Sequence, residues 1–184
     1  ENTSSRIRVG SQLSRGEAIR LALMSSENLA SAALGAHYPG GYSAFVKAMN
    51  AKAKMLGMER TQFVEATGLS PMNRSTARDL SRLVTAAYSY PLIRKYSTTV
   101  THTANFNKPN YVLGYTNSNL LVRGNSWQIG LSKTGFLTKA GRCLVMVATL
   151  QGKPTVMVML DSYGKRTPVG DAGRIKKWLE TGNS

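Results

Sequence analysis

The chain has 184 residues, which is enough for one domain with a substantial core and too short for two comfortable ones. Hydrophobic residues make up 42% and charged residues 18%, as in ordinary globular proteins, and the absence of a long apolar run excludes a membrane-spanning segment. The net charge of +15 predicts attraction to polyanions, but no aromatic stripe accompanies the basic residues, so we expect no nucleic-acid partner. The single cysteine, Cys143, excludes an internal disulfide, and with only His37 and His102 beside it we expect no metal or other cofactor.

The first half of the chain is predicted to be helical. Ser14 and Glu17 have the spacing of a capping box before an apolar run, and that helix ends near residues 25–26. The Ala-rich residues 28–36 predict a second, buried helix, which the Pro and Gly of residues 38–41 end. A third helix has its apolar face at Phe45, Met49 and Leu56 and stops at Gly57.

A fourth helix is predicted to start at Ser75 and to end before Pro91. Its apolar positions follow the i, i+3, i+4, i+7 pattern of an amphipathic helix. They are Leu80, Leu83, Val84 and Ala87. Two short extended segments follow, at residues 98–106 and 111–115.

The second half contains the strongest strand signals. Residues 142–150 and 155–160 are dense in Val, Met and Leu, and residues 151–154 join them as a turn, which predicts a central hairpin covered on both faces. Asp171 is expected to cap a last helix that buries its apolar residues. These are Ile175, Trp178 and Leu179. The order of elements predicts a mixed α/β (α+β) domain with an antiparallel sheet flanked by helices.

Two triplets could carry chemistry. Ser26-Glu27-Asn28 stands at the junction of two predicted helices, where a loop can present a hydroxyl and an amide to a cleft. Lys133-Thr134-Gly135 stands before the hairpin, where an edge strand could bind an extended peptide. Taken singly, the first triplet is equally compatible with helix capping, and the second with a surface lysine before a turn.

Taken together and in this order, the triplets resemble the Ser-x-Asn and Lys-Thr-Gly motifs of the low-molecular-mass penicillin-binding proteins. The resemblance extends over nearly the whole chain. It includes LALMSSEN at 21–28, STARDL at 75–80 and KTGF at 133–136. The segments HYPGGY at 37–42 and KAMNAKAK at 47–54 are most similar to the D-alanyl-D-alanine endopeptidase branch, the penicillin-binding protein 7 type. This resemblance implies a β-lactamase/transpeptidase-like fold.

Members of this family also carry a Ser-x-x-Lys motif upstream of Ser-x-Asn, with the nucleophile and its base one turn apart on a helix. Only 25 residues precede Ser26, and none forms that motif. The Ser162–Lys165 match lies in a predicted loop after Lys-Thr-Gly, so we interpret it as coincidence. Residues 1–184 are therefore expected to be the C-terminal part of one domain, lacking the N-terminal strands and the nucleophile helix. The partner would be an N-terminal fragment with Ser-x-x-Lys, without which we expect no cooperative unfolding in a thermal melt.

The resemblance implies catalytic roles for three residues. Ser26 would relay a proton toward the leaving amine, and Asn28 would hold the amide oxygen of the substrate. Lys133 would supply positive charge that lowers the pKa of nearby catalytic groups and attracts the carboxylate of the substrate.

The substrate-binding residues implied are Lys133, Thr134, Gly135 and Phe136. Thr134 would hydrogen-bond the substrate carboxylate, and the backbone N–H of Phe136 would form one arm of the oxyanion hole. Arg166 could add carboxylate recognition, although a solvated loop cation is the preferred interpretation. Glu27 is interpreted as a helix-start charge and not as a general base.

The function implied is that of a serine DD-peptidase of the bacterial periplasm, most similar to endopeptidases that cut D-alanyl–diaminopimelate cross-links. Peptidoglycan peptides would be its substrates and β-lactams its inhibitors, with at most peripheral association with a membrane. Three alternatives remain open. A D-alanyl-D-alanine carboxypeptidase would share the motifs, a β-lactam-hydrolysing relative would need a deacylating glutamate, and a non-catalytic basic module would bind an anionic polymer.

Overall fold

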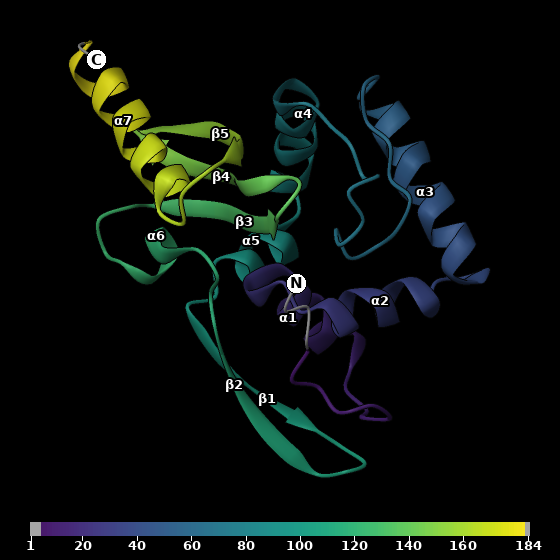
Figure 1. Ribbon diagram of the computed structural model, residues 1–184. Coiled ribbons are helices and arrows are strands. Elements are labelled where there is room, and N and C mark those ends of the chain that lie inside the picture. The colour runs from purple at the N-terminus through teal and green to yellow at the C-terminus, as the bar shows by residue number, and fades with distance from the viewer. Residues whose placement is uncertain (1–4, 183–184) are drawn as a thin grey trace.

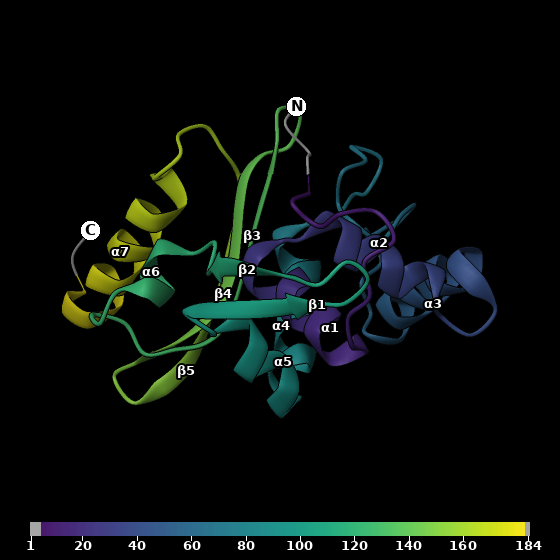
Figure 2. The ribbon, with the colours of Figure 1, turned by 90° about the horizontal axis from the view of Figure 1, so that it is seen from below.

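A computed structural model of the chain describes residues 5–182. Helices dominate the first half and strands the second, and the sheet separates α7 from α4 and α5 (Figures 1 and 2). In chain order the elements are α1 (Arg15–Ser25), α2 (Asn28–Ala36), α3 (Gly41–Met55), α4 (Ala77–Tyr88), α5 (Pro91–Ser97), β1 (Thr101–Phe106), β2 (Tyr111–Thr116), α6 (Leu120–Arg123), β3 (Ile129–Leu137), β4 (Gly141–Leu150), β5 (Lys153–Ser162) and α7 (Thr167–Thr181). The predicted mixed α/β fold with an antiparallel sheet is confirmed.

Helix α1 begins and ends as predicted. The Ser14 hydroxyl accepts a hydrogen bond from the Glu17 backbone N–H at 3.2 Å, which satisfies one of the free donors of the first turn. The Glu17 carboxylate, predicted to reach back over the cap, instead contacts His102 of β1 at 2.6 Å. This side chain therefore ties the start of α1 to the first strand.

Helix α2 is less buried than predicted. Only Ala30 and Gly35 are fully buried in it, and Leu29 is 41% exposed. Alanine side chains have little apolar area to bury. The Ala-rich composition therefore predicted that the segment is helical, but not that the helix is buried.

The fourth predicted helix is α4, and the sequence did not predict α5, which follows it. The cap of α4 is Thr76, one residue after the predicted start, and the Thr76 hydroxyl accepts from the Asp79 N–H at 3.1 Å. Pro91 does not simply end the helix. It is the first residue of α5, where a proline loses nothing because the first N–H groups of a helix have no acceptor within it.

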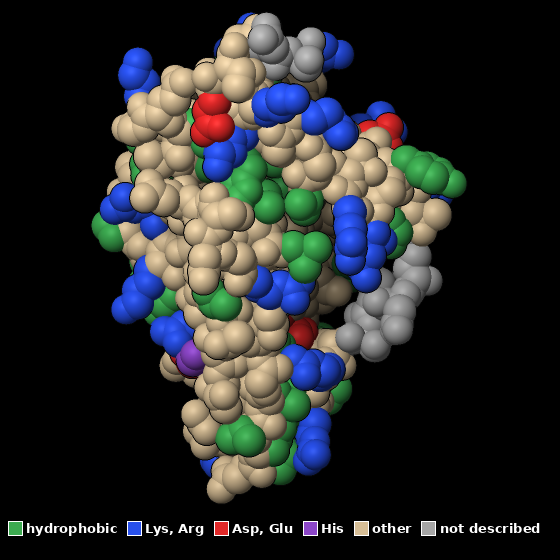
Figure 3. Space-filling view, turned by 90° about the vertical axis from the view of Figure 1, so that its left-hand side faces the viewer, with side chains coloured by type: hydrophobic (Ala, Val, Ile, Leu, Met, Phe, Trp, Pro, Cys, Tyr) green, Lys and Arg blue, Asp and Glu red, His purple; other side chains and the backbone are tan. Residues whose placement is uncertain are grey.

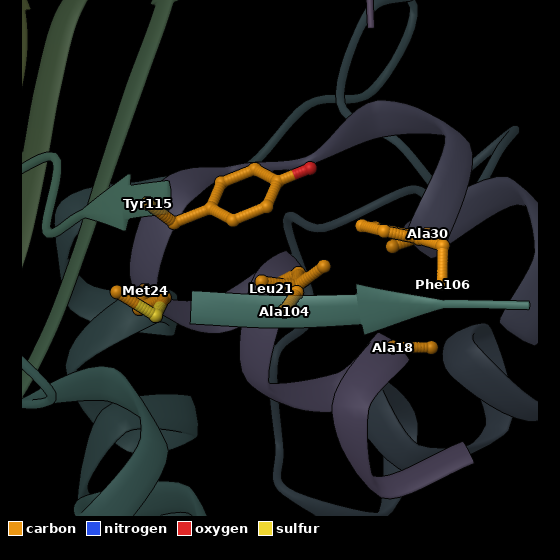
Figure 4. Close-up of a cluster of buried hydrophobic side chains, with 7 residues drawn as sticks. All are labelled: Ala18, Leu21, Met24, Ala30, Ala104, Phe106 and Tyr115. Carbon is orange, nitrogen blue, oxygen red and sulfur yellow. The ribbon is translucent and has the colours of Figure 1, made fainter. Parts of the chain in front are cut away.

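Strands β1 and β2 form a separate two-stranded antiparallel ribbon, in register from Thr101–Thr116 to Phe106–Tyr111. One face of this ribbon packs against α1 and α2 (Figure 4). The buried residues of this cluster are Ala18, Leu21, Met24, Ala30, Ala104, Phe106 and Tyr115. Because Leu21 and Met24 are completely buried, this cluster fixes the C-terminal end of α1.

The main sheet has the order β3-β4-β5, with both pairs antiparallel. The predicted hairpin is confirmed, but its turn is shorter than expected: Gln151 and Gly152 alone connect the strands, both with positive φ, as a tight hairpin turn requires. The central strand β4 is covered on both faces, by α7 on the Met146 face and by α4 and α5 on the Val147 face. β3 and β5 are its edges.

The last helix differs from the prediction. α7 begins at Thr167, so Asp171 lies inside it and pairs with Arg174 one turn later instead of capping. Ile175 packs on the sheet, whereas Trp178 is 52% exposed and Leu179 38% exposed. Their predicted burial is therefore wrong, since only one narrow stripe of α7 faces the sheet. In the described part of the chain, no helix is both long and apolar enough to cross a membrane.

Candidate active site

Ser26 lies at the corner between α1 and α2, in a backbone conformation unusual for its type. Its φ of 55° and ψ of 42° are left-handed, a conformation that is disfavoured by about 1–2 kcal/mol in residues with a side chain. The buried Leu21 and Met24 hold the preceding turn in place. A strained residue in a fixed corner aims its side chain in one direction, and such strain is common at functional sites.

Ser26 is the left-handed C-cap of α1, but neither its hydroxyl nor the Asn28 side chain caps a helix. The carboxylate of Glu27, which is 7% exposed, caps α2 by accepting from the Leu29 N–H at 3.3 Å, so the prediction of a helix-start charge at Glu27 is confirmed. Asn28 is the first residue of α2, and its side-chain amide has no hydrogen-bond partner among the described residues. That amide remains available to an external ligand. Burial, followed by the negative charge of Glu27, raises the pKa of the underlying Tyr115 to about 12.

Lys133 of β3 meets Ser26 across the site. The Lys133 ammonium donates hydrogen bonds to the Ser26 hydroxyl and to the backbone oxygen of Thr134. The Ser26 hydroxyl in turn lies 3.3 Å from the same Thr134 oxygen. Burial lowers the pKa of Lys133 to about 8, because the buried ammonium has lost water and gained no carboxylate. The two triplets that stand 107 residues apart are thus joined directly.

Thr134 contacts a residue that the sequence did not single out. Its hydroxyl donates to the Ser118 hydroxyl at 2.6 Å, and the Ser118 backbone N–H donates to the Met24 oxygen at 2.8 Å. Ser118 therefore bridges the Lys-Thr-Gly strand and the end of α1. Only its position between two asparagines, Asn117 and Asn119, could have drawn attention to it.

These two asparagines are buried and fix the loop around Ser118. Asn117 donates to the backbone oxygen of Ser97 at 2.9 Å, and Asn119 donates to the Ser132 hydroxyl at 2.9 Å. Each asparagine is only 2% exposed. Buried amides with all partners in place specify one geometry, so this network positions β3 relative to α5.

The end of β3 is open. Phe136 is 54% exposed, and β3 pairs with β4 along one edge only. A Cβ added to Gly135 would meet only the Cys143 Cβ, at an ordinary 3.7 Å, so packing within the described chain does not require glycine there. By contrast, a Cβ on Gly130 would lie 2.7 Å from the Tyr88 ring. An unobstructed glycine on an edge strand leaves room for an external backbone to approach.

All six residues predicted for the site line one cleft of about 940 Å³. They are Ser26, Asn28, Lys133, Thr134, Gly135 and Phe136. Ser118 also lines it, as do four arginine and lysine side chains that the sequence left unplaced or placed elsewhere. These are Arg123, Arg142, Lys165 and Arg166. None of the described residues that line the cleft is acidic, and blue side chains far outnumber red ones on the face in Figure 3.

Arg166 and the Ser162–Lys165 match lie between the end of β5 and the start of α7. Arg166 is exposed, as expected of a loop cation, but it borders the cleft, which makes the preferred interpretation of a purely solvated role incomplete. Ser162 ends β5 and Lys165 follows in the next loop, so the two do not share a helical turn. The interpretation of this Ser-x-x-Lys match as coincidence agrees with that geometry.

The histidines are not ligands of a metal site in the described residues. His102 bonds to Glu17 and to Arg20, and the His37 ring bonds to the Ala33 backbone oxygen at 2.9 Å. No group of three His, Cys, Asp or Glu side chains within residues 5–182 is arranged to hold a metal ion.

Comparisons with known proteins show the family and the fold. The Peptidase S11 family model, described as D-alanyl-D-alanine carboxypeptidase, matches residues 1–164. D-alanyl-D-alanine endopeptidases of Pseudomonas aeruginosa and Escherichia coli K12 are 56% and 54% identical over 178 residues, which is 97% of this chain. The chain spans 57% of the length of each. The structure of the Streptomyces K15 DD-transpeptidase has a TM-score of 0.88 and 26% identity, and the match covers 96% of this chain and 72% of that one.

Proposed function

This chain belongs to the Peptidase S11 family, and on that premise we propose that it is part of a serine DD-peptidase acting on peptidoglycan peptides. The observation that supports this most directly is the contact between the Lys133 ammonium and the Ser26 hydroxyl in a cleft without acidic residues. A hydroxyl, an ammonium with a lowered pKa and an open strand edge are what acyl transfer to and from a carboxylate-bearing peptide needs.

In this proposal residues 1–184 are the C-terminal part of one catalytic domain, and an N-terminal segment supplies Ser-x-x-Lys. That serine attacks the D-alanine carbonyl, the amine leaves, and water hydrolyses the acyl-enzyme. Ser26 passes a proton toward the leaving amine, because its hydroxyl already accepts a hydrogen bond from the ammonium of Lys133. With a pKa near 8, Lys133 can hold or release a proton close to neutral pH.

The remaining residues orient the substrate. The amide of Asn28 holds the substrate amide oxygen, and the Thr134 hydroxyl turns its O–H from Ser118 to the carboxylate next to the scissile bond. The Phe136 N–H forms one arm of the oxyanion hole, and Gly135 leaves room for the peptide backbone. Arg166 adds positive charge on the carboxylate side.

We further propose endopeptidase activity on D-alanyl–diaminopimelate cross-links, in the bacterial periplasm, with β-lactams as inhibitors. Support comes from two relatives named D-alanyl-D-alanine endopeptidases that are 54–56% identical, whereas a third relative of that name is 31% identical and three D-alanyl-D-alanine carboxypeptidases are 28% identical. Carboxypeptidase activity is the alternative. Rapid β-lactam hydrolysis is not expected, since no carboxylate lines the cleft in residues 5–182 to activate a deacylating water.

The test uses the full-length protein with fluorescent penicillin and with a cross-linked muropeptide. Ser26→Ala and Lys133→Ala should each lower kcat for cross-link cleavage by about 100-fold or more, the usual contribution of a positioned proton-transfer group. Ser25→Ala is the matched control, because the Ser25 hydroxyl bonds back to the Leu21 oxygen at 2.8 Å. Wild-type protein that neither binds penicillin covalently nor cleaves the muropeptide would refute the proposal.

A further inference from the structure

Ser118 presents an exposed hydroxyl to the cleft from between two buried residues. It lies in the loop that connects β2 to α6 and lines the cleft beside Thr134. Its neighbours in the chain, Asn117 and Asn119, are each 2% exposed, and their side-chain amides bond inward. The serine side chain is therefore the part of the Asn-Ser-Asn segment that a ligand in the cleft can reach.

Hydrogen bonds fix the backbone from which this hydroxyl projects. The Asn117 amide donates to the backbone oxygen of Ser97 at 2.9 Å, and the Ser118 N–H donates to the Met24 oxygen at 2.8 Å. Met24 is completely buried in the last turn of α1, two residues before Ser26. Ser118 is thus held against the corner that carries Ser26, and a side chain with one rotatable hydroxyl loses little freedom on binding there.

Ser118 and Thr134 form a pair of hydroxyl groups with one unused proton. The Thr134 hydroxyl donates to the Ser118 hydroxyl at 2.6 Å, which uses the only proton of Thr134. A hydroxyl has one donor and two acceptor positions, and within residues 5–182 the Ser118 hydroxyl donates to no other group. The pair therefore offers an O–H donor to an acceptor that enters the cleft.

The position of this pair indicates which acceptor it meets. In the proposed reaction Ser26 serves the leaving nitrogen, and a single carbon atom separates that nitrogen from the carboxylate of the leaving residue. The groups that bind the two must therefore be neighbours. The Ser26 hydroxyl lies 3.3 Å from the backbone oxygen of Thr134, and the Thr134 hydroxyl lies 2.6 Å from that of Ser118. Ser26, Thr134 and Ser118 thus form a continuous row along which nitrogen and carboxylate both find partners.

We propose that Ser118 is a substrate-binding residue whose hydroxyl, together with that of Thr134, binds the carboxylate of the leaving residue, each hydroxyl donating to one carboxylate oxygen. This inference rests on the proposed DD-peptidase function. When Thr134 turns its O–H from Ser118 to the ligand, the pair exchanges one neutral hydrogen bond for two charge-assisted ones. Leaving D-alanine and leaving diaminopimelate both carry this carboxylate, so Ser118 serves either kind of substrate.

The experiment compares two cross-linked peptides on the full-length protein. One has a free carboxylate on the carbon next to the scissile nitrogen, and the other has an amide there. Ser118→Ala should lower kcat/KM for the free carboxylate about tenfold, mainly through KM, and should change kcat/KM for the amide less than about threefold. Ser118→Thr keeps the hydroxyl and should stay within about threefold of the wild type on both peptides. Acylation by benzylpenicillin and by its methyl ester supplies the same comparison on a second pair of ligands.

A Thr134→Val background separates direct binding by Ser118 from an effect that passes through Thr134. Acylation by benzylpenicillin is followed there, because the covalent product accumulates even when the reaction is slow. Adding Ser118→Ala should slow this acylation about threefold or more, and no further slowing would overturn the inference.

Ser126→Ala is the matched control, since Ser126 is exposed outside the cleft and its loss should alter neither peptide. Equal losses for Ser118→Ala on the free carboxylate and on the amide, or no loss on either, would also overturn the inference. Absence of turnover and of penicillin labelling in the wild type would instead overturn the proposed function and the inference with it.

Discussion

Replacing Lys133 by Met should make the stability of the protein less dependent on pH. Burial lowers the pKa of Lys133 from 10.5 to about 8, so between these values the unfolded chain binds more protons than the folded protein. The free energy of unfolding of the wild type therefore rises as the pH rises through this window. Each pKa unit is worth about 1.4 kcal/mol, which sets a ceiling of roughly 3 kcal/mol for the whole shift. Between pH 7 and pH 10 the wild type should gain about 2–3 kcal/mol relative to Lys133→Met.

Urea unfolding of the full-length wild type and variant at pH 7, 8, 9 and 10 measures this difference. The constant part of the difference reflects the lost hydrogen bonds to Ser26 and Thr134, whereas only its pH dependence reports the buried charge. Lys153→Met is the control, since Lys153 is exposed at the start of β5 and its loss should add no pH dependence. A stability difference that stays constant from pH 7 to pH 10 would show that the ammonium is not desolvated.

Two further pairs of variants separate function from packing. Gly135→Ala should change the free energy of unfolding by less than about 0.5 kcal/mol yet slow acylation by penicillin at least about tenfold. Gly130→Ala should instead destabilise the protein by about 1–3 kcal/mol, because the added Cβ meets the Tyr88 ring. A stability loss for Gly135→Ala would contradict the open-edge interpretation. Asn117→Ala removes two buried hydrogen bonds and one partly buried one, and should cost about 3 kcal/mol in urea unfolding. The exposed Asn105→Ala should cost less than about 0.5 kcal/mol. Similar losses for both asparagines would refute the positioning role of the network.

Periodicity and turn chemistry predicted most of the fold. The hairpin of β4 and β5 was evident because its strands are continuously apolar and two residues with positive φ can close it. The errors fall at helix ends and on helix faces. Asp171 could have capped a helix that begins at the next residue, but α7 begins at Thr167, four residues before Asp171. Local sequence cannot decide between two starts when tertiary packing on the sheet selects one.

The site was less predictable than the fold. Ser26 and Lys133 were found from two triplets and a family resemblance, because the family motifs have those residue types in that order. Arg142 and Ser118 were missed, since nothing in the sequence indicates that β4 places Arg142 against Phe136 or that Ser118 meets Thr134. Such contacts depend on strand register and on a loop fixed by buried amides, which only the folded chain specifies.

Three unfavourable features of this chain lie at one cleft. Ser26 has a strained backbone, and within residues 5–182 the Lys133 ammonium has no carboxylate and the Asn28 amide no hydrogen-bond partner. Elsewhere an acidic residue can have several partners: the Asp79 carboxylate at the start of α4 accepts two hydrogen bonds and pairs with Arg82. This chain would gain stability by pairing these groups internally. That it does not is the physical reason to assign the cleft, and not the basic surface as a whole, as the place where an anionic peptide binds.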